Sequence, residues 1–80
     1  MDTNIDLEIE KINKRLYRNR IDQYTERYKS WNWISTWEIR GIISAREKIR
    51  ELLVSGKRVT AGYYCTAVRG YHDYFIIWKD

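Results

Sequence analysis

The chain has 80 residues and a formal net charge of +4, with 15 Lys and Arg against 11 Asp and Glu, and it contains one cysteine and one histidine. This length suits a single small domain over residues 1–80, and one Cys with one His excludes an intrachain disulfide and a zinc site. We therefore expect no metal and no cofactor. A domain of this size has a small core and is only marginally stable, so we expect large aromatic side chains or a second copy of the chain to provide additional stability.

No apolar run approaches the length of a membrane span, and the acidic start of the chain lacks the basic and then hydrophobic order of a secretion signal. The sequence therefore predicts a cytoplasmic protein without a membrane partner, which the single cysteine also favours. Its short, proline-free composition, rich in Ile, Tyr and basic residues, is compatible with an accessory protein of a virus or a mobile element.

Apolar residues recur at spacings of three and four from Ile5 onward, which predicts a long helix over residues 4–29. The apolar stripe is interrupted between Leu16 and Tyr24, where Arg20 takes the expected apolar position. A bend or a change of packing partner is expected at that point.

A second helix is predicted to begin at Thr36, because Ser35 and Glu38 have the spacing of a capping box. Gly56 stands where a helix C-cap belongs, so this helix should continue to about residue 55. Gly41 would cost about 1 kcal/mol relative to alanine inside that helix, and close contact between helices is its expected purpose.

Three tryptophans, Trp31, Trp33 and Trp37, surround the start of this second helix. We expect them to close the elbow between two helices that fold back on each other, which is a structural role in the core. The alternative is that one of them, with Trp33 as the best candidate, faces solvent as a stacking platform.

The segments 57–68 and 73–79 are rich in β-branched and aromatic residues, and Gly70 lies between them, which predicts a C-terminal β-hairpin. The expected fold is therefore α+β with the order ααββ. If the loop has two or four residues, one face of the hairpin carries Val59, Ala61, Tyr63, Cys65, Ala67, Tyr74, Ile76 and Trp78, and the other carries Thr60, Gly62, Tyr64, Thr66, Val68, Phe75 and Ile77. A loop of three residues would pair the two sets differently.

Both hairpin faces carry large apolar groups, but two helices can cover only one of them. A lone hairpin also leaves two open edges, so a homodimer with a four-stranded sheet would satisfy both needs. The favoured function is a non-enzymatic interaction protein, such as a small inhibitor or adaptor, that binds a protein partner. Its predicted interface consists of Tyr64, Tyr71, Phe75, Ile77 and Trp33.

A basic stripe formed by Lys11, Lys14, Arg15 and Arg18 supports an alternative function, because these residues share one helical face. Such a stripe can contact nucleic-acid phosphates independently of base sequence. It can equally be a solvated face that Glu8 and Glu10 balance, with Glu10 and Lys14 at the favourable i, i+4 spacing.

No residue pattern predicts catalysis or a small-molecule substrate. His72 and Asp73 are adjacent and should point to opposite faces of a strand, with no nucleophile placed beside them by spacing. Cys65 has no CxxC partner and is expected to be a buried, inert thiol. We therefore expect the protein not to be an enzyme.

Overall fold

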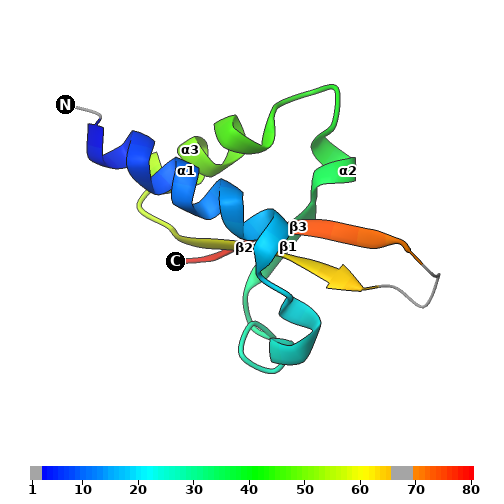
Figure 1. Ribbon diagram of the computed structural model, residues 1–80. Coiled ribbons are helices and arrows are strands. Elements are labelled where there is room, and N and C mark those ends of the chain that lie inside the picture. Colours follow the sequence, from blue (N-terminus) through cyan, green and yellow to red (C-terminus); the bar gives the residue numbers. More distant parts are fainter. Residues whose placement is uncertain (1–2, 66–69) are drawn as a thin grey trace.

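The computed structural model describes residues 3–65 and 70–80, which form a small α+β domain with a three-stranded antiparallel sheet (Figure 1). The elements in chain order are α1 (Thr3–Arg18), the 3-10 helix η1 (Ile21–Tyr24), β1 (Asn32–Ser35), α2 (Thr36–Ile39), α3 (Ala45–Val54), β2 (Arg58–Cys65) and β3 (His72–Lys79). The α+β class is confirmed. The order differs from ααββ, because a strand precedes α2 and the second helix is divided.

The main core lies between the two longer helices and one face of the sheet. Helices α1 and α3 lie on the same side of the sheet in Figure 1. Helix α1 is amphipathic, as its apolar stripe predicted. The buried residues of that stripe pack with buried residues of α3 and the sheet. The fully or almost fully buried residues of this core are Ile9, Ile12, Leu16, Ile39, Ile49, Leu52, Ala61 and Ile76.

Helix α1 ends at Arg18, so the predicted continuation to residue 29 is wrong. The chain leaves the helix because Asn19 and Arg20 turn to the outer edge of β2. The N–H of Tyr63 donates to the Asn19 carbonyl oxygen at 2.8 Å, and Asn19 Nδ2 donates to the Ala61 carbonyl oxygen at 2.9 Å. Arg20 also forms a parallel bridge with Tyr63. The outer edge of β2 is therefore partly paired within the chain.

The segment 19–31 then covers the second face of the sheet, which was expected to be bare. Figure 1 shows this segment on the side of the sheet opposite α1 and α3. Ile21 from the segment and Ile77 from β3 are both 0% exposed. The Trp33 ring packs edge-on against Phe75 at 5.4 Å between centroids. The expectation of an uncovered hairpin face is wrong, since the chain supplies the cover itself.

The tryptophan stretch, predicted as an elbow between helices, is partly a strand. β1 pairs with β3 antiparallel, with Ile34 opposite Ile76, and β3 is consequently the central strand in the order β1–β3–β2. Trp33 does not form a solvent-facing platform, because it is half-buried and its Nε1–H donates to the Tyr28 carbonyl oxygen at 2.9 Å. The third strand of the sheet thus comes from the same chain.

The predicted second helix begins correctly but is divided in two. Ser35 caps it, with its Oγ accepting from the Trp37 N–H at 3.0 Å, yet α2 ends after one turn. Gly41 has a φ of +85°, which no right-handed helix contains, and a Cβ there would meet nothing within 4 Å. Its role is therefore a turn and not close helix contact. Ser44 caps α3, since its Oγ accepts from the Glu47 N–H at 3.1 Å.

The hairpin and the end of the second helix agree with the sequence prediction. Ser55 is the C-cap of α3, and Gly56 follows it with a φ of +80°, the left-handed conformation that glycine favours directly after a helix. In the pairing of β2 with β3, Cys65 lies opposite His72. This register places the described strand residues on the same two faces that the sequence predicted. The predicted positions Thr66, Ala67 and Val68 lie outside the described residues.

Candidate docking groove

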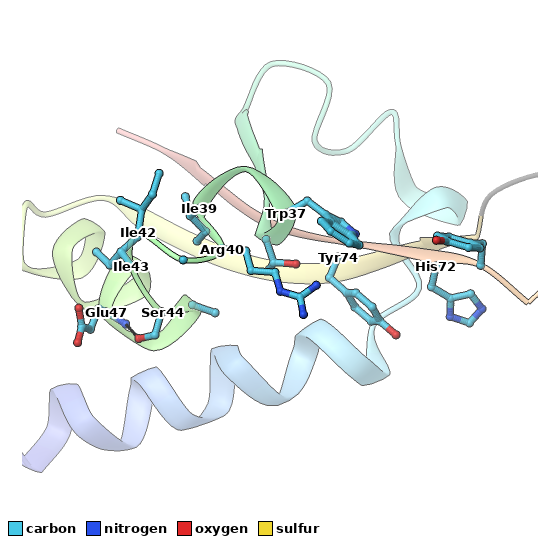
Figure 2. Close-up of a pocket in the computed structure, with 13 residues that line it drawn as sticks. Trp37, Ile39, Arg40, Ile42, Ile43, Ser44, Glu47, His72 and Tyr74 are labelled. Carbon is cyan, nitrogen blue, oxygen red and sulfur yellow. Dashed lines mark hydrogen bonds between the residues drawn. The ribbon is translucent and has the colours of Figure 1, made fainter.

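A groove opens between the segment that joins α2 to α3 and the beginning of β3, with a volume of about 750 Å³ (Figure 2). It lies where Gly41 turns the chain after α2 and before Ser44 caps α3. Its lining residues belong to the segment 36–47 and to Tyr71, His72 and Tyr74.

The rim of the groove carries large apolar side chains in water. Ile42 is 82% exposed, Trp37 is 57% exposed and Tyr71 is 56% exposed. In Figure 2, Ile42 and Trp37 lie apart, and the buried Ile39 lies between them, close to Ile42. Single exposed apolar residues are ordinary, but a group of them around one concavity is typical of an interaction site.

Arg40 is the positive charge of the groove. Its guanidinium carbon lies 5.0 Å from the centroid of the Trp37 ring, within cation–π range. In Figure 2 the guanidinium lies below Trp37 and beside Tyr74, whereas Glu47 lies at the far end of the groove. Within residues 3–65 and 70–80 no carboxylate forms an ion pair with Arg40.

Ring contacts support the wall that β3 contributes. The His72 ring stacks on Tyr63, with centroids 5.1 Å apart and an interplanar angle of 13°. The Tyr74 ring lies 5.2 Å from that of Tyr17, which projects from α1. These contacts hold the wall in place before any partner binds, so the groove is already formed in the free chain.

The strand register separates His72 from Asp73, as the sequence predicted. His72 lies opposite Cys65 and Asp73 lies opposite Tyr64, on the other face of the sheet. Cys65 is half-buried at the end of β2, not fully buried as expected, and its Sγ is 3.8 Å from His72 Nε2. The Cys65 thiol, which was predicted to be buried and inert, therefore lies beside the imidazole ring of His72.

The five predicted interface residues do not form one surface. Ile77 is buried, and Trp33 and Phe75 are half-buried and pack edge-on against each other, away from the groove. Tyr64 is 37% exposed on the second face, and only Tyr71 lies at the groove. The expected core role of Trp37 is wrong, because its side chain is 57% exposed at the groove. The sequence prediction missed Ile42, which is exposed beside the break at Gly41.

The predicted basic stripe lies on the face of α1 that points away from the core. Lys11, Lys14 and Arg18 are exposed and Arg15 is half-buried. No ion pair within the described part of the chain includes any of the four.

Two acids of α1, Asp6 and Glu10, pair with α3 and not with the stripe. Glu10 accepts from Arg46 Nε at 2.6 Å, and Asp6 accepts from Arg50 Nη2 at 2.6 Å. The hydrogen bond from Arg46 is the main reason that the pKa of Glu10 lies below its usual value, and Lys14 has only a smaller coulombic effect. The expected Glu10–Lys14 pairing is therefore replaced by a contact between helices.

The described residues contain no group of three or more His, Cys, Asp or Glu side chains that could hold a metal ion. Over the same residues, no helix has both the length and the apolar character needed to cross a membrane. No family model, no curated protein and no solved structure matches the chain.

Proposed function

We propose that the protein is a non-enzymatic interaction protein that binds a segment of a partner protein in the groove between residues 36–47 and the beginning of β3. The observation that carries this proposal is the group of exposed apolar side chains, Trp37, Ile42 and Tyr71, around one preformed concavity. Burial of such side chains contributes about 25 cal/mol per Å² of apolar area. Aromatic residues are also enriched where protein interfaces concentrate their binding energy.

The form of the groove suits a protein segment better than an enclosed small molecule. Ile42 projects from the rim and remains 82% exposed, so a ligand confined to the interior would leave most of it in water. A peptide segment that crosses the groove can cover Ile42 and Trp37 together. The caps at Ser35 and Ser44 fix the connecting segment on both sides, which lowers the entropy cost of binding.

Photocrosslinking from within the groove tests the proposal. A benzophenone amino acid replaces Ile42, and in a matched control it replaces Val54, which is 67% exposed at the other end of α3. The partner identified by mass spectrometry is purified and bound again to wild-type protein and to Trp37→Ala. We expect crosslinks from position 42 and not from position 54, and a loss of about 2 kcal/mol or more in binding for Trp37→Ala.

Two other outcomes of that experiment have a definite meaning. Equal crosslinking from both positions, or unchanged binding by Trp37→Ala, would reject the groove as the docking site. Crosslinks between two copies, together with a dimer mass in light scattering, would identify a second copy of this chain as the occupant. The homodimer would then form through the groove and not through the hairpin edge at β3, which β1 already occupies.

A second candidate function is nucleic-acid binding through the stripe Lys11, Lys14, Arg15 and Arg18. The observation in its favour is that none of the four cations forms an ion pair within the described part of the chain, while Asp6 and Glu10 are paired with α3. Side chains in such an arrangement can contact several phosphates of a duplex or a single strand without reading the bases. Chromatography with light scattering, with and without mixed-sequence nucleic acid at two salt concentrations, separates this function from protein docking.

A further inference from the structure

The backbone conformation of Arg40 directs its side chain into the groove. The Arg40 N–H caps α2 by donating to the Trp37 carbonyl oxygen at 3.3 Å, and the residue then takes an extended conformation with φ −61° and ψ 129°. From there its side chain turns back over the Trp37 ring, where the guanidinium lies within the groove (Figure 2). The cation is therefore presented beside the most prominent aromatic group of the site.

Arg40 also differs from many other bases of the chain in its partners. Several bases face a carboxylate, namely Arg20, Lys29, Arg46, Lys48, Arg50 and Lys57. Among the described residues, the contact of its guanidinium is with the Trp37 ring and not with a carboxylate, and Glu47, the acid in the groove lining, lies at the far end. Most of the hydrogen-bonding capacity of the guanidinium thus remains open to a ligand.

We infer that the partner segment carries a carboxylate that pairs with Arg40, next to a bulky apolar side chain that packs between Trp37 and Ile42. This inference rests on the proposed function and names the chemistry of its partner. A guanidinium over an aromatic ring offers a planar, two-pronged donor that matches a carboxylate. A segment that covered Arg40 without supplying an acceptor would leave a desolvated charge unpaired, which is costly.

We expect the charges around the groove to set the orientation in which the partner segment binds. Its carboxylate belongs at the Trp37 end, because Glu47 repels a second acid at the far end. The net charge of +4 favours the approach of an acidic partner before contact. The occupant is therefore an acidic protein segment with an apolar anchor, not a basic or purely apolar one.

Selection from a displayed library of random peptides tests this inference on the full chain. Enriched peptides are synthesised with a fluorophore, and their affinities are measured by anisotropy against wild type, Arg40→Gln, Trp37→Ala and Ile42→Ser. Arg58→Gln is the matched control, since Arg58 is an exposed arginine at the start of β2, outside the groove lining. Circular dichroism confirms that each variant is folded.

The expected peptides contain Asp or Glu close to Trp, Phe, Leu or Ile. Their affinity should fall about 10-fold or more in Arg40→Gln and in Trp37→Ala, and it should not change in Arg58→Gln. Arg40→Glu should bind better when the peptide carboxylate is replaced by lysine, which a purely structural role of Arg40 would not produce.

The remaining outcomes distinguish the inference from the proposed function. Peptides that need Trp37 and Ile42 but lack acids, and that bind Arg40→Gln normally, would overturn the inference and leave the docking groove intact. Acidic peptides that respond to Lys14→Glu/Arg18→Glu and not to Arg40→Gln would also overturn it. A selection without enrichment, or peptides indifferent to Trp37 and Ile42, would overturn both.

Discussion

Gly62 lies directly against Ile21, so closely that a Cβ at Gly62 would stand 2.2 Å from Ile21 Cγ2. The same Cβ would lie 2.6 Å from the backbone oxygen of Asn19, which is hydrogen-bonded to β2 and cannot easily retreat. This contact is the point at which the segment 19–31 closes over the second face of the sheet. The segment 19–31 can approach the sheet this closely only because Gly62 has no side chain.

We therefore expect Gly62→Ala to lower the free energy of unfolding by about 1–3 kcal/mol, as overpacking does. Urea denaturation measures the change, and Val54→Ala at an exposed site of α3 is the control with little effect. If Gly62→Ala were neutral, the segment 19–31 would not pack on the sheet in the way described.

Substitution of Gly41 tests whether the second helix is divided. In an unbroken helix, as the sequence predicted, Gly41→Ala would stabilise the protein by about 1 kcal/mol. With a φ of +85° the same substitution should destabilise it by about 1 kcal/mol, even though no atom lies within 4 Å of the new Cβ. Thermal or urea unfolding gives the sign directly, and a stabilised variant would contradict the division into α2 and α3.

Much of the local structure was predictable from the sequence, because short-range signals determine it. The cap at Ser35, the helix end before Gly56 and the two hairpin faces follow from neighbouring residues and strand alternation. The end of α1 and the strand β1 depend on contacts across the chain, such as Asn19 with Ala61 and β1 with β3. Sequence periodicity contains no information on such partners, although the gap after Leu16 did mark the place.

The candidate site was less predictable than the fold for the same reason. Of the expected interface residues, only Tyr71 lies at the groove. Tyr64, Phe75 and Ile77 were assigned to a hairpin face that the segment 19–31 partly covers, and Trp33 was assigned to an elbow between helices that is in fact a strand. Ile42 belonged to a predicted helix, where it would have been counted as core. Its exposure follows from the positive φ of Gly41, which a sequence pattern cannot distinguish from a glycine that allows close packing.

Ile77 and Tyr64, both assigned to the interface from the sequence, should now behave differently. Ile77→Ala removes a fully buried side chain and should cost about 2–5 kcal/mol of stability. Tyr64→Ala, at a site 37% exposed, should cost clearly less. Parallel denaturation curves check the pair, and equal losses would contradict the burial of Ile77 under the segment 19–31.

The Glu10–Arg46 ion pair predicts a stability difference that depends on pH. The hydrogen bond from Arg46 lowers the folded-state pKa of Glu10, so its contribution is present above the unfolded-state pKa and disappears as the pH falls through the folded-state value. Wild type should therefore be more stable than Glu10→Gln at neutral pH, and the difference should vanish in acid. Unfolding curves for both proteins from pH 7 downward measure it, and a constant difference would exclude this pair as the source.

Charge reversal on the stripe separates the two candidate functions. Lys14→Glu/Arg18→Glu should leave stability almost unchanged, since no ion pair of the described residues includes either side chain. If the stripe binds phosphates, the double variant should lose affinity for a labelled mixed-sequence duplex, and the dependence of log affinity on log salt should weaken by roughly one per removed cation. Trp37→Ala/Ile42→Ser should have no such effect on the duplex. If wild type does not bind the duplex even at low salt, the stripe serves only to attract an acidic protein, and the groove remains the one binding site proposed.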